Sequence, residues 1–271
     1  MGTDDRMRTH DPDPGKSRKS RRIRPLQVFL LCAVILSGAG AMALLRSLTD
    51  PRIPSLPEAG QLKRGGSVTF GTFEQDGETD NGPEAIPWTV LEVQEDRVLL
   101  LARDILSPGA YHDRYEAVTW EDCTLRHWLN DAFLRDSFTE DEKEMILTVS
   151  NENPDNPGME SHGCGVTKDK VFLLRMEEYS AYMRTEEDRF VTGSAGPTRY
   201  ALLRHLETDD GTGANPGRAC WWLRTAGSDQ YAAVFVDRDG SIHAAGAQVS
   251  HTTYCGIRPA VWVTYSGLPD G

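Results

Sequence analysis

Zinc sites need two close pairs of ligands, and this sequence offers only one such pair, His162 and Cys164. The chain also has no His-Glu-x-x-His motif, no Gly-x-Ser-x-Gly motif and no phosphate-binding glycine loop. With only five cysteines in 271 residues, it is not a disulfide-rich miniprotein. These absences exclude the common signatures of metalloproteases, serine hydrolases and nucleotide-binding enzymes. We therefore predict no metal, no cofactor and no catalytic residue, which favours a role other than catalysis.

Positive charge is scarce in most of the chain. The sequence has 29 Lys and Arg residues against 41 Asp and Glu residues, which gives a formal net charge of -12. Residues 61–271 hold 19 of the basic and 35 of the acidic residues, so this part alone carries -16, whereas residues 1–24 carry +4. A domain this acidic repels phosphate backbones, so we predict that it does not bind nucleic acid.

An uncharged stretch of 20 residues, from Leu26 to Leu45, follows the basic segment. As a helix rising about 1.5 Å per residue, it would be about 30 Å long and would match the hydrocarbon core of a bilayer. Excess Lys and Arg stays on the cytoplasmic side, so residues 1–24 are predicted inside and the acidic part outside. The alternative is a cleavable signal peptide, since residues 37–43 contain small residues at Ala-x-Ala spacing.

These patterns divide the chain into five segments. Residues 1–24 are predicted to be a disordered basic cytoplasmic tail, and residues 25–45 a transmembrane signal-anchor helix. Residues 46–66 contain three prolines and end in two glycines, which favours a stiff stalk. The extracytoplasmic domain is expected over residues 67–265, and residues 266–271 are expected to be a flexible C-terminus. The predicted location is therefore the cell membrane, crossed once.

The order of strands and helices within the predicted domain indicates an α+β fold. Alternating and apolar runs separated by turns predict the strands, and capping patterns before an apolar face predict two or three helices. The expected strands are residues 67–73, 86–93, 97–102, 170–174, 220–225, 231–236, 241–244 and 256–263, and the helices begin near residues 119, 139 and 177. We expect the two ends of the domain to meet in one mixed, mainly antiparallel sheet.

Four cysteines follow the predicted membrane segment, which is an even number in an oxidising location. They are Cys123, Cys164, Cys220 and Cys255, and they allow three pairings. Cys220 and Cys255 each lie at the edge of an expected strand, so we favour a disulfide between them, which leaves Cys123 with Cys164. No local signature supports a reactive thiol that acts as a nucleophile.

Aromatic and basic residues gather in the last quarter of the chain. The candidate ligand-binding residues there are Trp221, Trp222, Arg224, Asp229, Tyr231, His251 and Tyr254. On a strand, Trp221 and Trp222 face opposite sides. Either one packs in the core while the other meets a sugar or a partner side chain, or both are buried between two layers. Arg258 and Trp262 are expected to be structural, Arg258 as a buried and paired arginine.

Two further motifs have a chemical interpretation. Asp113 and Glu116 are the best-placed carboxylates for a glycosidase pair, although their loop is typical of solvated surface. Asp237 to Gly240 resembles the start of a calcium loop, but the twelfth position is Gln248, and an Asp-Gly step is typical of a tight hairpin turn. We predict a surface loop in the first case and a turn in the second.

Four separated motifs occur in order: Ile-Pro-Trp-Thr-Val-Leu at 86–91, Leu-Arg-His-Trp-Leu-Asn at 125–130, Trp-Trp-Leu-Arg at 221–224 and Ile-Arg-Pro-Ala-Val-Trp at 257–262. Together they resemble an exported bacterial domain family of unknown function, over nearly all of residues 67–263. That family is in turn similar to the C-type-lectin-like group that includes formylglycine-generating sulfatase activators, and only Trp222 to Arg224 and Gly256 to Arg258 match that wider group's pattern. The resemblance implies a two-layer α+β domain with long loops. The activators' oxidase activity is not implied, because Cys220 and Cys255 are far apart in sequence.

The sequence leaves three functions open. The first is a membrane-anchored extracytoplasmic module that binds a glycan or an envelope protein without catalysis. The second is a cell-envelope hydrolase or oxidoreductase whose site lies in loops that no motif reveals. The third is a structural envelope scaffold, in which the stalk sets the distance from the membrane. A cleft that joins buried titratable groups would favour the second function, and a shallow aromatic surface would favour the first.

Overall fold

The computed structural model describes residues 61–209 and 217–264. The chain divides into two units, Met1–Ile53 and Pro54–Gly271, and every described residue belongs to the second. The predicted tail, the predicted membrane helix, most of the stalk and the predicted flexible C-terminus therefore lie outside the described residues. What the structure describes is the acidic domain.

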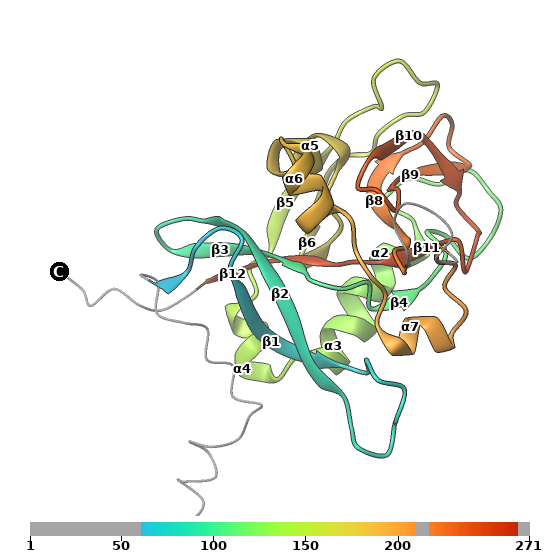
Figure 1. The fold of residues 1–271 in the computed structure, drawn as a ribbon. Coiled ribbons are helices and arrows are strands. Elements are labelled where there is room, and N and C mark those ends of the chain that lie inside the picture. Colours follow the sequence, from blue (N-terminus) through green and yellow to red (C-terminus); the bar gives the residue numbers. More distant parts are fainter. Residues whose placement is uncertain (1–60, 210–216, 265–271) are drawn as a thin grey trace, which may run out of the picture. The chain divides into compact units, whose positions relative to one another are not determined.

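This domain is a mixed α+β structure with two five-stranded sheets and a two-stranded ribbon (Figure 1). The first sheet has the order β1 (Ser67–Phe73), β2 (Glu84–Val93), β3 (Arg97–Ala102), β12 (Ala260–Thr264), β7 (Val171–Phe172). The second sheet has the order β10 (Ile242–Gln248), β9 (Ala232–Val236), β8 (Cys220–Ala226), β11 (Cys255–Ile257), β4 (Ser107–Pro108). The ribbon pairs β5 (Val149–Asn153) with β6 (Gly165–Asp169). The described strand pairs are antiparallel except β8 with β11.

Short helical segments connect the strands. The helix α2 (Thr124–Trp128), the π-helical turn η2 (Leu129–Phe133) and the helix α3 (Leu134–Ser137) form one continuous run. The remaining segments are α4 (Glu140–Met145), α5 (Met176–Tyr182), α6 (Glu186–Asp188), η3 (Arg189–Gly193) and α7 (Arg199–Leu203). The chain thus uses brief helices between long loops.

Helix starts follow the predicted capping chemistry in one case and differ in another. The capping box at residues 139–142 forms, with the Glu142 carboxylate accepting the Thr139 N–H at 2.7 Å and Thr139 Oγ1 accepting the Glu142 N–H at 3.3 Å. The helix expected directly after Thr119 begins later, at Thr124. Its cap is Cys123, whose Sγ accepts the N–H of Arg126 at 3.4 Å.

The hairpin predicted around residues 237–240 forms between β9 and β10. The Asp237 N–H donates to the Ser241 carbonyl at 2.8 Å, and Gly240 has a φ of +81°, which favours glycine. The two aspartates of the turn accept nearby backbone N–H groups, since Asp237 binds that of Arg238 and Asp239 that of Ser241, each at 2.8 Å. The calcium-like sequence therefore builds a turn.

The segment predicted as one strand over residues 256–263 is divided in the structure. It breaks at Arg258 and Pro259 into β11 and β12, and these two strands belong to different sheets. Proline has no N–H to donate to a neighbouring strand, and the Pro259 carbonyl accepts the N–H of Ala102 as the chain crosses. The expected single sheet is therefore wrong, although β12 does join the ends of the domain by pairing with β3.

Both faces of β8, the central strand of the second sheet, are covered. Trp221 and Trp222 point to opposite faces of β8, and both are fully buried. Trp221 packs against Tyr179 of α5 with ring centroids 5.6 Å apart, and Trp222 packs against Tyr111 at 6.0 Å. Each indole N–H has a backbone acceptor, the carbonyl of Gly193 for Trp221 and that of Gly109 for Trp222. The middle of this sheet is therefore buried on both sides, while its edge strand β10 is partly exposed.

Candidate functional site

A cleft of about 750 Å³ is lined by residues from the end of β1, from the α2–η2–α3 run and from α7. This volume lies within the range of about 300–1,000 Å³ that is typical of ligand pockets. We call it the aromatic cleft, and the lining residues used below are Phe73, Glu74, Asp113, Thr124, Trp128, Phe133, Asp136, Tyr200, Arg204.

Three partly exposed rings line the aromatic cleft, and each comes from a different element. Phe73 ends β1, Trp128 ends α2, and Tyr200 lies on α7. The Phe73 ring stands nearly perpendicular to the other two, with centroids 6.5 Å from Trp128 and 5.8 Å from Tyr200. Buried Phe133 packs 5.6 Å from Phe73 and 5.2 Å from Trp128. The packing fixes these rings before any ligand arrives, which lowers the entropy cost of binding.

Two carboxylates of the cleft are engaged by neighbouring residues. Asp136 accepts from the Nε and Nη2 atoms of Arg135 at 2.8 and 3.0 Å. Glu74 accepts the N–H of Gly77 at 2.6 Å. Arg204 brings a positive charge to the α7 side, 5.5 Å from the centroid of the Tyr200 ring, and has no ion-pair partner among the described residues.

Asp113 is held at the cleft by its backbone, while its side chain stays open. Thr124 Oγ1 accepts the Asp113 N–H at 3.0 Å, and the Thr124 N–H donates to Nδ1 of buried His112 at 3.2 Å. Because Nδ1 accepts, we assign the His112 proton to Nε2, which donates it to Glu116 at 2.9 Å. Asp113 Oδ1 lies 3.7 Å from that nitrogen and 3.5 Å from Arg114 Nε, beyond hydrogen-bond range. Glu116 is therefore engaged, and Asp113 is available to a ligand.

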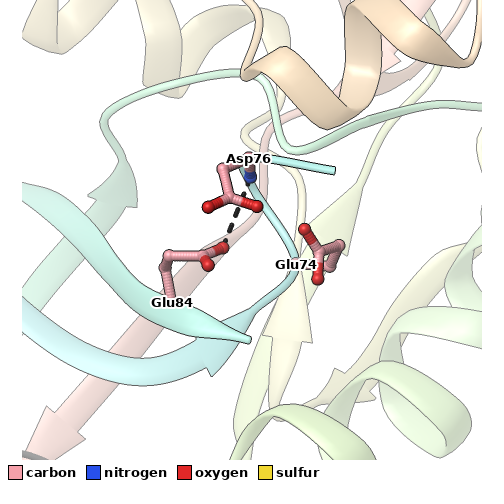
Figure 2. A group of neighbouring side chains, drawn as sticks. All are labelled: Glu74, Asp76 and Glu84. Atoms are coloured by element: carbon pink, nitrogen blue, oxygen red, sulfur yellow. Dashed lines mark hydrogen bonds between the residues drawn. The ribbon is translucent and has the colours of Figure 1, made fainter. Parts of the chain in front are cut away.

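Figure 2 shows three carboxylates, Glu74, Asp76 and Glu84, that converge at the base of the loop between β1 and β2. Their ligand atoms lie within 4.8 Å of one another, so they are spaced to hold a metal ion. The loop itself uses these oxygens. Glu84 accepts the Asp76 N–H at 3.4 Å, and Asp76 accepts from Glu78 N and Asn81 Nδ2 at 2.7 and 2.9 Å, which lowers the pKa of Asp76. The cluster therefore has a structural explanation without an ion.

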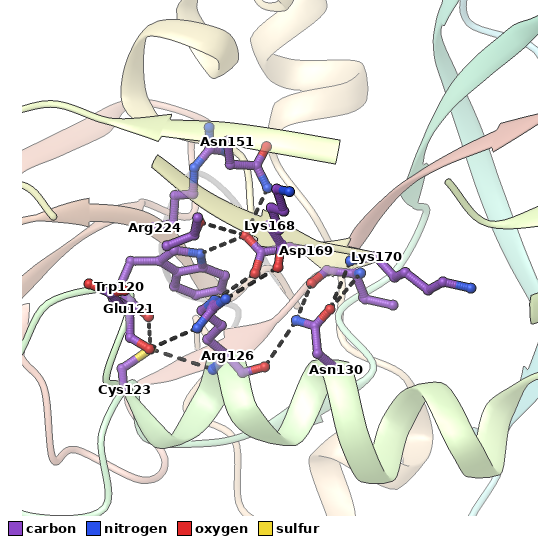
Figure 3. A network of polar contacts seen from close by, with 12 residues as sticks. Trp120, Glu121, Cys123, Arg126, Asn130, Asn151, Lys168, Asp169, Lys170 and Arg224 are labelled. Atoms are coloured by element: carbon purple, nitrogen blue, oxygen red, sulfur yellow. Dashed lines mark hydrogen bonds and ion pairs between the residues drawn. The ribbon is translucent and has the colours of Figure 1, made fainter. Parts of the chain in front are cut away.

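A second polar group is closed to ligands. The side chain of Asp169 is fully buried, and it accepts from Trp120 Nε1, Arg126 Nε, Asn151 Nδ2 and Thr167 Oγ1 at 3.2, 2.5, 2.9 and 2.7 Å (Figure 3). These four donors saturate the carboxylate. The network ties α2 to the ribbon of β5 and β6, and its role is structural.

The structure places three of the predicted ligand-binding residues in the core. Trp221 and Trp222 are both fully buried, so the second of the two alternatives holds. Arg224 is only 2% exposed; it forms a two-point ion pair with Glu178, with both N···O distances 2.6 Å, and donates from Nε to Asn153 Oδ1 at 3.0 Å. These three side chains present no surface to a large ligand.

The other four predicted residues lie on loops beside the second sheet and form two pairs. Tyr231 packs against Tyr115 with centroids 5.1 Å apart, and both rings are well exposed, at 42% and 65%. Asp229 accepts the Tyr231 N–H at 2.8 Å. The His251 ring lies 6.0 Å from that of Tyr254. None of these four predicted residues lines the aromatic cleft.

Arg258 and Trp262, predicted as structural, both pack against other side chains. Arg258 is buried over the Trp221 ring, 4.9 Å from its centroid. Its guanidinium donates to the carbonyl oxygens of Ala102, Arg103, Thr192 and Gly193. Burial lowers the pKa of Arg258 to about 10. Trp262 is partly buried beneath the guanidinium of Arg97, at 4.7 Å.

Cys220 and Cys255 occupy paired positions on the parallel strands β8 and β11, and both are buried. Neighbouring strands lie about 4.8 Å apart, within the Cα range of disulfides, about 4.4–6.8 Å. All four described cysteines are free thiols in this structure. Burial and the neighbouring Cys220 raise the pKa of Cys255, and burial raises that of Cys123 to about 12. Both disulfides stay predictions.

Sequence reasoning missed the rings of the cleft. Phe73 was expected as a strand residue, Trp128 as part of the apolar face of a helix, and Tyr200 was not singled out. One signal points to Phe73, because it is the last apolar residue before the acidic loop that follows β1. Of the cleft residues, the sequence singled out Asp113, whose loop is exposed as predicted.

The comparisons with known proteins give a family and no function. A family model described as a domain of unknown function, DUF6273, matches residues 95–265. Searches of the curated proteins and of the solved structures returned no match. The matched region contains Asp113, Trp128 and Tyr200, whereas Phe73 precedes it. Among the described residues, no helix has both the length and the apolar character needed to cross a bilayer.

Proposed function

Since the chain belongs to DUF6273, a family of domains of unknown function, we propose its function from its own surface: it is a ligand-binding module, and its ligand occupies the aromatic cleft. The observation that carries this proposal is the set of three partly exposed rings, from β1, α2 and α7, that pack around one cleft beside the available carboxylate of Asp113. An apolar surface with a few polar groups is the usual make-up of a binding site.

The distribution of displaced pKa values supports binding over chemistry. Active sites collect titratable groups whose pKa is shifted by burial or by charged neighbours. The described groups whose pKa burial raises are Tyr111, Cys123, Cys164, Tyr179, Tyr182, Tyr254 and Cys255. None of them lines the aromatic cleft.

The proposal includes the location predicted from the sequence. The uncharged residues 26–45 after the basic residues 1–24 support a single-pass membrane anchor with a cytoplasmic tail. The stalk expected over residues 46–66 would then separate the domain from the bilayer only as far as residue 60, because Leu62 is buried in the domain and Gly65 and Gly66 pair with Val90. A domain in that position can meet the glycans and proteins of the cell envelope, and we propose that the ligand is one of these.

We also propose that the fold is C-type-lectin-like and that the protein is bacterial. The two layers, short helices and long loops support this assignment. The motif residues that carry the resemblance lie in the interior, since Arg224 binds Glu178 and Arg258 binds backbone carbonyls. Their role in the motif is then to hold the loops in place, and the ligand contacts come from other residues.

The test compares binding to the full-length chain, purified in a mild detergent, with binding to single variants. Isolated envelope glycans and envelope proteins are screened first, and the best binder is titrated by calorimetry. Trp128→Ala and Tyr200→Ala should each weaken binding about tenfold or more, since aromatic anchors contribute roughly 1–3 kcal/mol.

Two matched controls locate the site. Trp262→Ala removes a partly buried tryptophan outside the cleft, and Tyr231→Ala removes an exposed ring of the other aromatic pair. Both should bind as the parent does. Binding that depends on Tyr231 and ignores Trp128 and Tyr200 would contradict the proposal. Circular dichroism of each variant checks that the domain remains folded.

A further inference from the structure

We propose that the ligand of the aromatic cleft is a basic peptide segment, with a Lys or Arg side chain seated between Asp113 and the Trp128 ring. This inference rests on the proposed function, because it names the ligand class of the same site. It follows from the charge of the cleft, the placement of Asp113 beside Trp128, and the position of Arg204.

The charge of the cleft is negative. Its lining residues Glu74, Asp113, Asp136 and Arg204 sum to a formal charge of -2, and outside the lining Arg135 pairs with Asp136 and Arg114 lies 3.5 Å from Asp113. The surrounding residues 61–271 carry -16, so the field of the domain has the same sign as its cleft. Such a field attracts cations, raises their association rate and repels anionic ligands.

Asp113 and Trp128 lie on the same side of the cleft because α2 holds both. Thr124, the first residue of α2, accepts the Asp113 N–H at 3.0 Å. Trp128 is four residues further along, so it lies one turn away on the same helix face. A carboxylate and an aromatic ring that line the same cleft can recognise a cation in two ways, by a charge-assisted hydrogen bond and by cation–π attraction.

Asp113 is the carboxylate that we expect to contact the cation, because the fold already uses the other two carboxylates of the cleft. Asp136 is already bound at both oxygens by Arg135, and Glu74 holds the loop at Gly77. Asp113 has 64% of its side chain exposed, and its nearest cation is exposed Arg114, whose Nε lies 3.5 Å from Oδ1 while its Nη2 binds Glu116 at 3.0 Å. A cationic side chain that binds here therefore competes only with water and with this long, exposed contact to Arg114.

Arg204 gives the cleft a polarity along its length. Its guanidinium lies over Tyr200 on the α7 side, whereas Asp113 lies on the α2 side. A cationic group is repelled near Tyr200 and attracted near Trp128. The volume of about 750 Å³ exceeds what one side chain fills, so the peptide brings further residues onto the rings of Phe73 and Tyr200.

The experiment measures binding of dye-labelled hexapeptides to the full-length chain in mild detergent. The probe alternates arginine with leucine. A second peptide replaces each arginine by citrulline, which keeps the shape and removes the charge, and a neutral N-acetylglucosamine hexasaccharide serves as the glycan. We expect the arginine peptide to bind at least about tenfold more tightly than either, and its binding to weaken several-fold when salt rises from about 0.05 to 0.5 M.

Three variants locate the charge effect. Asp113→Asn should weaken binding of the arginine peptide about three- to tenfold and leave the citrulline peptide unchanged. Asp122→Asn removes the same charge from an exposed position outside the cleft and should change neither. Arg204→Gln should strengthen binding of the arginine peptide about two- to threefold, because it removes a repulsive charge. A merely structural role for Arg204 would not produce a gain.

The outcomes separate this inference from the proposed function. Equal binding of the arginine and citrulline peptides, preferential binding of the hexasaccharide, or no saturable binding of the arginine peptide would each overturn the basic-peptide inference. The proposed function survives those outcomes if Trp128→Ala weakens binding of any envelope ligand. It fails if the arginine peptide binds and Trp128→Ala leaves that binding intact.

Discussion

The charged residues of the core and those of the aromatic cleft differ in how fully the fold engages them. Arg224 and Asp169 are buried, and each has several partners at hydrogen-bond distance. Asp113 and Arg204 are exposed. Among the described residues, Arg204 has no ion-pair partner, and Asp113 has only contacts of 3.5 Å with Arg114 and 3.7 Å with His112. The comparison teaches that charges used for stability are saturated by their neighbours. The unsaturated charges beside preformed rings are the ones that mark a binding surface.

The largest expected effect concerns a saturated charge of the core. Replacing Arg224 with Met removes the two-point ion pair of Glu178 and the donor to Asn153 Oδ1, so Arg224→Met should lower the free energy of unfolding by about 3–5 kcal/mol. Urea denaturation followed by tryptophan fluorescence measures it. The matched change in the cleft, Arg204→Met, should cost less than about 0.5 kcal/mol. Equal losses of unfolding free energy in the two variants would contradict the difference between core and cleft charges.

The second-largest loss of stability is expected at Asp169, the buried carboxylate of the network in Figure 3. Asp169→Asn keeps the shape but turns one oxygen into a donor that faces Trp120 or Asn151, so we expect a loss of about 2–3 kcal/mol. The control is Asp136→Asn in the cleft, where an exposed ion pair with Arg135 contributes about 0–0.5 kcal/mol. The same urea titration reads both. A cost for Asp136→Asn as large as that for Asp169→Asn would contradict this ordering.

A pH titration tests burial at Cys123, which caps α2. Burial raises the pKa of Cys123 to about 12, whereas an unfolded cysteine titrates near about 8.5. The folded domain therefore binds this proton more tightly, so stability is intact below about pH 8.5 and falls as the pH rises toward 12.

In reducing buffer, the parent chain should lose about 1–2 kcal/mol more than Cys123→Ala between pH 8 and pH 10. Urea midpoints at the two pH values give the difference in slope, and groups common to both chains cancel. Parallel pH profiles for the two chains would show that the thiol is not desolvated, and the buried cap on α2 would need another description.

The smallest effect on stability is expected at the ligand contact itself. Asp113→Asn should change the free energy of unfolding by less than about 0.5 kcal/mol, because its side chain accepts no close hydrogen bond from the fold. Calorimetric melting of parent and variant measures the change. A loss above about 1 kcal/mol would show that Asp113 stabilises the fold. It would then contradict our view that Asp113 is left free for a ligand.

Local chemistry made part of this fold predictable from the sequence. The turn at residues 237–240 and the capping box at 139–142 formed as expected, because each depends on side chains within four residues of one another. The division of residues 256–263 between two sheets was not predicted. It depends on the pairing of β11 with β8 and of β12 with β3, which involve residues far apart in the chain.

The cleft was less predictable than the fold for the same reason. Its rings come from β1, α2 and α7, and no periodic pattern relates Phe73, Trp128 and Tyr200. Clustering of aromatic residues along the sequence pointed instead to Trp221 and Trp222, which the two covered faces of β8 bury. Density of aromatic residues in a sequence reports the core as readily as it reports a binding surface.

Both sheets of the domain depend on residues 255–264, because the chain crosses from one sheet to the other at Pro259. β11 is the bridge between β8 and β4, and β12 is the bridge between β3 and β7, so each sheet closes only when this terminal stretch is present. A growing chain that has been synthesised as far as residue 254 holds two incomplete layers with open edges, which proteases and other exposed strands can engage. A chain that stops at residue 254 should therefore leave no half-domain to accumulate, whereas chains that include β11 and β12 should persist.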